Sequence, residues 1–295
     1  MYNDSIAFPH LHILLKHVGK HLMIGNFSIA FYGMCIALGM MLAFLFIMRE
    51  VKRVGMKQDD FMDMFVAGIL FGIIGARIYY VVFSWDMYKD DLLQIFNIRG
   101  GGLAIYGGII GGLITVIICC RIKKLSFFKC ADILCFGVLI GQICGRYGNF
   151  FNREAFGRYT DSLFAMRLPI DAVNRSCDIT TEMMRNAVTV NGIKCIQVHP
   201  TFLYESVMNL CIFFFLLWYR KRKKFDGEIF LWYMALYGLG RSFIERLRTD
   251  QLIIPGSSVP VSALLGILLF AVCVLYMWFF KYRKMVRFWA EKKKA

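Results

Sequence analysis

Two arginines and a glutamate lie inside long apolar stretches of this sequence, where charged side chains are rare. Arg146 lies near the end of one such stretch, and Arg241 and Glu245 lie four residues apart in another. A charged group at membrane depth costs several kcal/mol or more, and it persists where it faces a polar cavity, pairs with another charge or binds a ligand. Arginine is well suited to hold phosphate oxygens in a two-pronged geometry. These residue types therefore indicate a site for an anionic headgroup.

The composition places these charges in a membrane protein. The 295 residues are 58% hydrophobic and include 28 Phe, which is too apolar for an ordinary soluble domain. The apolar runs do not alternate with polar residues, as strands of a membrane barrel do. We expect an all-α integral membrane protein with a bundle of seven transmembrane helices, near 27–47, 61–83, 103–120, 131–150, 201–219, 229–247 and 261–280.

The net charge of +15 comes from basic residues whose distribution along the chain indicates the orientation of these helices. Of the 35 Lys and Arg residues, 20 lie in alternate loops and the C-terminal tail, at 49–57, 121–129, 220–224 and 281–294. Positive residues collect on the cytoplasmic side, so we expect the N-terminus outside and the C-terminus in the cytoplasm. Because topology explains the basic excess, we expect no nucleic-acid partner.

The spans divide the chain into five parts. We expect an extracytoplasmic N-terminal segment at 1–26, four spans at 27–150, a small extracytoplasmic head at 151–200, three spans at 201–280 and a basic cytoplasmic tail at 281–295. Residues 1–26 have no apolar core of a signal peptide, so the first span is expected to direct insertion. In the head, Lys194–Val198 suits a strand. Cys177 and Cys195 share this loop, and both the paired and the unpaired state stay open.

Glycines recur four residues apart within several spans. This spacing lets two helix backbones approach closely in lipid, so packing is the expected role of most of these residues. They are Gly68 and Gly72, Gly107 and Gly111, and Gly137, Gly141 and Gly145.

The expected orientation brings the polar residues of six spans to one level, the outer half of the bilayer. They are Tyr32, Arg77, Tyr106, Arg146, Tyr204, Glu205, Arg241 and Glu245. Interfacial anchoring could account for single members of this set, and Arg241 and Glu245 could neutralise each other across one turn. Two arginines and a glutamate at depth exceed what anchoring requires, so the set favours a site open to the outer leaflet.

A motif follows the fourth span into the head. It reads Gly-Arg-Tyr-Gly-Asn-Phe-Phe-Asn-Arg-Glu-Ala-Phe-Gly at 145–157. It supplies an arginine, two amides three residues apart, a carboxylate, and glycines that permit sharp turns. This pattern resembles the signature of the prolipoprotein diacylglyceryl transferases, integral membrane enzymes of bacteria.

Four further blocks extend the resemblance through most of the chain, in the same order. They are Phe-Tyr-Gly at 31–33, Gly-Gly-Leu-Ala-Ile-Tyr-Gly-Gly at 101–108, His-Pro-Thr-Phe-Leu-Tyr-Glu at 199–205, and Tyr-Gly-Leu-Gly-Arg-Ser-Phe-Ile-Glu at 237–245 followed by Arg248. Five blocks in the same order make the resemblance to this family specific, whereas a single block would not.

The resemblance implies a reaction and its partners. Such an enzyme moves the diacylglyceryl group of phosphatidylglycerol onto the thiol of the lipobox cysteine of an exported prolipoprotein. A thioether forms and glycerol 1-phosphate leaves. The resemblance implies no metal and no organic cofactor. It places the protein in the bacterial cell membrane, with the active site facing the extracytoplasmic leaflet.

The same resemblance assigns expected roles to residues. Arg146 and Arg241 correspond to the essential arginines, which are expected to bind the phosphate and offset charge on the leaving group. The expected catalytic residues are Arg146, Arg241, Tyr106, Glu154 and Glu245. The expected substrate-binding residues are Arg146, Asn149, Asn152, Gly157, Tyr32, Tyr237 and His199.

One position departs from the family pattern. Many members have histidine, a proposed base, where this chain has Tyr106, and tyrosine with a pKa of about 10 is a poorer base. His199 could instead remove the thiol proton, or it could cap the helix that Pro200 begins. We hypothesise that the cationic cluster lowers the thiol pKa enough that no dedicated base is needed.

Other classes fit less well. A transporter or flippase for an anionic lipid would be expected to place polar residues through the full membrane thickness, often with an internal repeat. A phosphotransferase for CDP-alcohols would require an Asp-rich metal motif, and neither pattern is present in the sequence.

The hypothesis about the thiol predicts that Tyr106→Phe keeps substantial activity. The loss should be far smaller than the ~10²–10⁴-fold that removal of a general base costs. The measurement is the rate of diacylglyceryl transfer from phosphatidylglycerol to a lipobox peptide. A complete loss of transfer would give the Tyr106 hydroxyl a direct role and refute the hypothesis.

Overall fold

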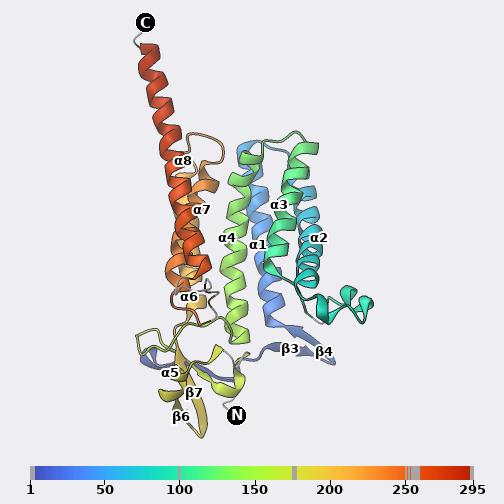
Figure 1. Ribbon diagram of the computed structural model, residues 1–295, viewed down its shortest axis with the longest axis vertical. Helices are drawn as coiled ribbons and strands as arrows, with labels where there is room; N and C mark the ends of the chain where they lie inside the picture. Colours follow the sequence, from blue (N-terminus) through green and yellow to red (C-terminus); the bar gives the residue numbers. More distant parts are fainter. Residues whose placement is uncertain are drawn as a thin grey trace. The chain divides into compact units, whose positions relative to one another are not determined.

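The computed structural model describes residues 4–98, 101–174, 178–249, 251, 253 and 260–292 (Figure 1). Most of these residues are helical. The long helices are α1 (Phe31–Val54), α2 (Gln58–Phe83), α3 (Ile105–Ile122), α4 (Phe127–Asn152), α6 (Thr201–Tyr219), α7 (Glu228–Glu245) and α8 (Val261–Lys292). Within the described ranges, six helices are long and apolar enough to cross a membrane, namely α1, α2, α3, α4, α6 and Val261–Phe280 of α8. The protein is therefore a multi-pass helical membrane protein.

Helix α7 stands apart from those six by its charge. It coincides with the predicted span at 229–247 and has 18 residues, but three of them are charged, Glu228, Arg241 and Glu245. Glu228 is buried at the first turn, where its carboxylate accepts a hydrogen bond from the Tyr219 hydroxyl at 2.6 Å. An acidic residue at a helix N-terminus is favourable because it faces the positive end of the helix dipole.

The first predicted span begins later than expected. Residues 27–30 form strand β4 (Phe27–Ala30), which pairs with β3 (His21–Ile24) in a two-stranded hairpin. Helix α1 starts at Phe31, directly after this hairpin. Apolarity predicted the membrane character of the region, but it did not reveal the switch from strand to helix.

The chain divides into two compact units. One unit is Phe44–Leu134, and the other combines Met1–Ala43 with Cys135–Ala295. Helices α1 and α4 therefore contribute to both. Of the predicted site residues, all but Tyr106 lie in the larger unit.

In the unit Phe44–Leu134, α2 and α3 lie side by side because glycines meet at their contact (Figure 1). A Cβ added at Gly107 would lie 2.2 Å from the Gly75 carbonyl oxygen, and one at Gly111 would lie 2.4 Å from that of Phe71. The packing role predicted for Gly107 and Gly111 is confirmed. Gly141 faces α1, where a Cβ added at Gly39 would lie 3.5 Å from the Gly141 Cα, so its packing role is also supported. An added Cβ at Gly68 or Gly145 meets no described neighbour within 4 Å, so the same prediction is wrong for these two.

Arg77 stabilises the loop that follows α2. Its guanidinium group donates hydrogen bonds of 2.6–3.2 Å to the backbone carbonyls of Gln94, Ile95, Asn97, Gly101 and Gly102. The side chain also lies over the ring of Tyr88, at 5.1 Å from its centroid. Although sequence depth grouped Arg77 with the other polar residues, these contacts give it a structural role in folding this loop.

The head contains a five-stranded sheet built from two distant segments. Strands β5 (Met166–Pro169), β6 (Val188–Val190) and β7 (Ile193–Val198) come from the loop after α4, and β7 covers the strand expected near 194–198. Strands β1 (Ile6–Phe8) and β2 (Ile13–Leu15) come from the N-terminal segment, and the order is β2-β1-β5-β7-β6. Asn191 and Gly192, both with positive φ, form the tight turn between β6 and β7.

One face of this sheet and the short helix α5 (Thr181–Arg185) enclose the apolar core of the head. Its fully buried members include Ile6, Leu168, Met183, Ile196 and Val198. Cys195 on β7 is a buried free thiol, and the pairing with Cys177 considered above falls outside the described residues. The head is thus a packed structure in which the N-terminal segment supplies two strands.

The contact between α2 and α3 yields a matched test. Gly107→Ala should destabilise the protein by about 1–3 kcal/mol, because the new methyl group overlaps backbone atoms. Gly108→Ala should be neutral or slightly stabilising, since its nearest neighbour lies 3.6 Å away and alanine favours helix. The measurement is the free energy of unfolding in detergent micelles. Equal effects of the two substitutions would contradict the close approach at Gly107.

Candidate active site

Helix α4 carries the first part of the motif at 145–157 and ends within it. Arg153 adopts a left-handed conformation with φ of 53°. Its N–H donates to the Phe150 carbonyl and the N–H of Glu154 donates to that of Asn149, both at 3.1 Å. This pair of bonds is a Schellman motif, in which glycine is the usual left-handed residue. Arginine at that position costs about 1–2 kcal/mol of backbone strain.

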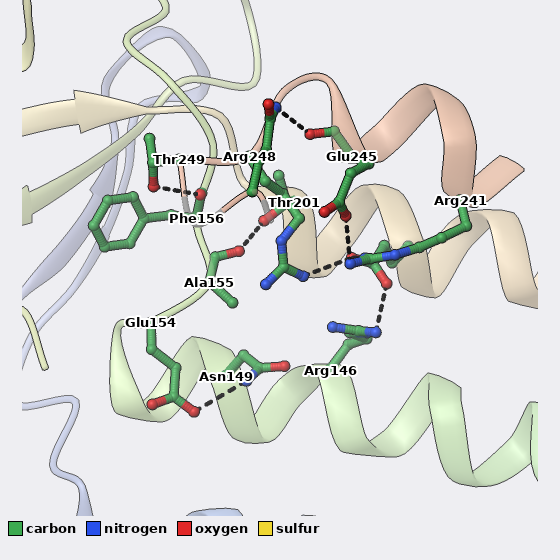
Figure 2. A network of polar contacts seen from close by, with 12 residues as sticks. Arg146, Asn149, Glu154, Ala155, Phe156, Thr201, Arg241, Glu245, Arg248 and Thr249 are labelled. Atoms are coloured by element: carbon green, nitrogen blue, oxygen red, sulfur yellow. Dashed lines mark hydrogen bonds and ion pairs between the residues drawn. The ribbon is translucent and has the colours of Figure 1, made fainter. Parts of the chain in front are cut away.

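Three arginines bind the carboxylate of Glu205, and we call this set the guanidinium cluster. Figure 2 shows the side chains of Arg146, Arg241 and Arg248 converging. Nη2 of Arg146 lies 2.6 Å from Oε2 of Glu205. Nη1 of Arg241 donates to Oε1 at 2.6 Å, and Nη1 of Arg248 reaches the same oxygen at 3.4 Å. Glu205 is only 1% exposed. This one buried carboxylate on α6 therefore holds guanidinium groups from α4, from α7 and from the residues just after α7.

Glu245 adds a second carboxylate to the cluster. Its Oε2 lies 2.6 Å from Nη2 of Arg241, one turn earlier on α7. The ion pair suggested by their spacing is therefore present, but Arg241 also binds Glu205. The pair of Arg241 and Glu245 is thus one part of a larger cluster.

The cluster leaves two of its arginines accessible to a ligand. Among the described residues, its three guanidinium groups pair with the carboxylates of Glu205 and Glu245. The side chains of Arg146 and Arg241 are 20% and 19% exposed, so each retains a surface on which a ligand can bind. A single negative charge, such as that of a phosphodiester, would complement this site.

Glu154 lies apart from the arginines in a cradle of three amides, of which Figure 2 shows Asn149. Its Oε1 accepts hydrogen bonds from Nδ2 of Asn149 at 3.0 Å and of Asn152 at 3.4 Å. Its Oε2 accepts one from Nδ2 of Asn174 at 2.7 Å. The two amides of the motif thus hold the carboxylate of the motif, and the head supplies the third.

Gly157 joins the motif to the ends of α6 and α7. Its N–H donates to the His199 carbonyl at 2.9 Å, and it forms a bridge to Arg248. A Cβ on Gly157 would lie 2.7 Å from that of His199 and 2.8 Å from the Leu247 carbonyl oxygen. The absence of a side chain at Gly157 therefore permits the backbone contact that brings these segments together.

The ring of His199 faces a hydroxyl group rather than a helix end. Its Nδ1 lies 3.2 Å from the Tyr204 hydroxyl. The contacts of this ring do not support the capping role considered for His199. Burial lowers the pKa of His199 below its usual value, which favours the neutral imidazole.

Two tyrosines predicted for the site come from α1 and α7. The ring of Tyr32 packs so closely on Gly148 that an added Cβ there would lie 2.7 Å from it. Tyr237 stacks on Tyr233 at 5.7 Å, one turn before Arg241 on α7. Both predicted residues therefore lie in the same unit as the cluster.

Tyr106 belongs to the other unit. It lies at the start of α3, is 62% exposed, and its ring centroid is 6.3 Å from that of Tyr79. Its role in the site stays a prediction.

Sequence reasoning placed Glu205 among the polar residues of the expected site without a specific role, and it gave no site role to Arg248 or Asn174. Glu205 and Arg248 were visible as members of the matching blocks, and Glu205 is a carboxylate in an apolar run, which is itself a signal. Asn174 lies in the head, 20 residues beyond Glu154, and no pattern in the sequence links the two.

Comparison with known proteins agrees with this site. A family model described as prolipoprotein diacylglyceryl transferase matches residues 20–279. The chain belongs to this family. A phosphatidylglycerol–prolipoprotein diacylglyceryl transferase of Clostridioides difficile (strain 630) is 43% identical over 242 residues, which are 82% of this chain and 88% of that protein. One of Finegoldia magna is 40% identical over 260 residues, covering 88% of this chain and 93% of that protein.

The match to the transferase family includes the whole site. The motif at 145–157, Glu205 and the cluster residues of α7 all fall within 20–279. Strands β1 and β2 of the head precede the matched region, although they belong to the sheet beside the motif. The residues of the cluster therefore lie within the matched region, while the hairpin of β1 and β2 lies outside it.

The central carboxylate gives a test of the cluster. Glu205→Gln should destabilise the protein by about 3–5 kcal/mol, because it leaves guanidinium groups near one another without their shared counter-charge. The value should fall at the lower end, since Arg146 and Arg241 are partly exposed to solvent. Denaturant unfolding in detergent measures this free energy. Glu182→Gln, on the exposed surface of α5, is the control and should change it by less than about 0.5 kcal/mol.

Proposed function

We propose that this protein transfers the diacylglyceryl group of phosphatidylglycerol to the lipobox cysteine of prolipoproteins, the first step of lipoprotein maturation. Membership of the transferase family supports the reaction, and the relatives named above carry both substrates in their names. The single observation that carries the proposal for this chain is the guanidinium cluster, in which Arg146 and Arg241 are aligned by one buried carboxylate and stay partly exposed.

Arg146 and Arg241 bind the phosphate of the lipid. Glu205 aligns both groups from behind, and Glu245 fixes the second Nη of Arg241, so the remaining N–H donors are oriented before the lipid arrives. Preoriented donors stabilise developing charge without a reorganisation cost at the moment of reaction.

The chemistry is a displacement at an sp³ carbon. The cysteine sulfur forms a bond to the terminal glycerol carbon of the diacylglyceryl group, and the bond from that carbon to the phosphate oxygen breaks. Glycerol 1-phosphate leaves with the electron pair, and the thiol proton passes to solvent or to the departing phosphate. The cluster offsets the charge on the leaving group and favours the thiolate of the incoming cysteine.

The remaining predicted residues bind the polar parts of the substrates. Asn149, Asn152 and Glu154 form a hydrogen-bonded group that suits the glycerol hydroxyls of the headgroup. Tyr32 and Tyr237 contribute phenolic groups at the edges of the site, Gly157 keeps the motif closed, and His199 and Tyr106 act through hydrogen bonds.

The protein crosses the membrane seven times, with α7 as the sixth span. Its charges then lie within the bundle, where Arg241 and Glu245 are paired. The N-terminus is outside and the basic C-terminus is cytoplasmic, since Lys and Arg collect in alternate loops. In this orientation the cluster faces the extracytoplasmic leaflet, where exported prolipoproteins and phosphatidylglycerol meet.

The test uses purified protein, phosphatidylglycerol vesicles and a lipobox peptide. Mass measurement should show a diacylglyceryl increment on the peptide cysteine. Arg146→Ala and Arg241→Ala should each slow the reaction by about 10²–10³-fold, the cost of losing a preoriented donor. Arg246→Ala, which alters an exposed arginine beside the cluster, should leave the rate within about twofold, since surface substitutions are usually mild.

Two results would overturn the proposal. One is an unmodified peptide with folded wild-type protein, and movement of labelled lipid across the vesicle bilayer in that case would favour the flippase interpretation. The other is full activity in both arginine variants, which would remove the cluster from the reaction.

A further inference from the structure

Arg153 is the charged residue of the motif that the proposed chemistry leaves unused. It directly precedes Glu154, yet its side chain is 0% exposed and points away from solvent into the head. Its Nη2 donates to the backbone carbonyls of Asp4 at 2.8 Å and of Val18 at 2.5 Å, and Nη1 donates to that of Phe151 at 3.3 Å. A buried guanidinium is therefore held chiefly by carbonyl oxygens of a segment about 150 residues away in the chain.

The two distant carbonyls form the base of one loop. The N–H of Val18 donates to the Asp4 carbonyl at 2.9 Å, which closes residues 4–18 on themselves. Strands β1 and β2 lie within this loop and join the head sheet through β5. Arg153 thus holds the base of an already closed hairpin, because the N–H groups of its Nη2 donate to two neighbouring carbonyl oxygens.

The backbone around Glu154 is strained on both sides. Arg153 and Ala155 have φ of 53° and 55°, in the left-handed region that disfavours residues with a Cβ. The Ala155 carbonyl accepts a hydrogen bond from the Thr201 hydroxyl at the start of α6. Glu154 is therefore presented by a short turn that is anchored to α6 on one side and to the N-terminal segment on the other.

Glycine would fit the position of Arg153 better, because glycine adopts the left-handed conformation without a Cβ clash. The arginine keeps an unfavourable backbone and contributes a buried side chain that no substrate can reach. Its contribution must therefore come through the segment it holds and the turn it fixes.

We propose that Arg153 is a positioning residue, which fixes the turn carrying Glu154 by clamping the carbonyls of Asp4 and Val18. Residues 4–18 are then part of the scaffold of the active site, although they precede the region matched by the family model. The clamp itself is inferred from the contacts of Arg153 alone. Its effect on catalysis rests on the proposed function.

The variants Arg153→Gly and Arg153→Lys separate the clamp from the backbone. Glycine suits the turn but removes the guanidinium. Lysine keeps a charge, but it presents one ammonium group in place of the planar guanidinium, whose Nη1 also donates to the Phe151 carbonyl. We expect both variants to remain folded and to lower kcat by about 10²-fold, the effect of a small misplacement of a site residue. The KM for phosphatidylglycerol should stay near the wild-type value, because Arg146 and Arg241 are untouched.

Rescue of activity by added guanidinium ion distinguishes the clamp from a general effect on stability. Millimolar guanidinium chloride should restore part of the kcat of Arg153→Gly, by occupying the vacated space between the two carbonyls, and should not restore Arg153→Lys. Arg158→Gly, which removes an exposed arginine from the same loop, is the matched control and should behave like the wild type. A wild-type kcat in Arg153→Gly, or a loss explained wholly by a smaller folded fraction, would overturn the proposal.

Hydrogen exchange tests the clamp without reference to activity. In Arg153→Gly, peptides covering 4–18 and 153–157 should exchange faster than in the wild type, while α2 and α3 should be unchanged. Unchanged exchange in both peptides would refute the clamp even if transfer were slow. If the wild-type protein transfers nothing, the proposed function fails, and faster exchange in the variant would still establish the clamp.

Discussion

The site depends on the burial of one carboxylate among three guanidinium groups. Two positive charges about 5 Å apart repel by roughly 3 kcal/mol at an effective dielectric constant of 20, so arginines do not gather without a shared counter-charge. Glu205 supplies it from a helix that carries none of the three arginines. Its burial keeps water from competing for the ion pairs, and the partial exposure of Arg146 and Arg241 leaves donors for a ligand. The same contacts that hold the helices together therefore prepare the site for an anion.

The backbone around the cluster is fixed by a second set of contacts. The motif leaves α4 through a left-handed turn, and the closely packed Gly157 then contacts both the start of α6 and the end of α7. Amide side chains orient Glu154 within this turn. The head is thus a continuation of the site rather than a separate appendage, because its sheet takes strands from the N-terminal segment that Arg153 holds.

Much of the site could be predicted from the sequence, because the signals were local. Arg146 and Arg241 stood out as charges in apolar runs, and the amides of Asn149 and Asn152 preceded a carboxylate at short spacing. The partner of those arginines was harder to identify, since Glu205 pairs across 36 and 59 positions with residues of other helices. Glycine spacing predicted the contact at Gly107 and Gly111 but failed at Gly68 and Gly145, because spacing shows that a close approach is permitted and not that a neighbour is present.

The sequence by itself determined that this is a helical membrane protein of the transferase family and which charged residues are candidates for its chemistry, since hydropathy and short motifs are properties of neighbouring residues. Only the tertiary structure decided that Glu205 is the centre of the cluster, that Asn174 joins the cradle of Glu154, and that Arg153 reaches the N-terminal segment. These are contacts between segments tens to more than a hundred residues apart. Such contacts depend on how helices and strands pack, and no local pattern specifies that packing.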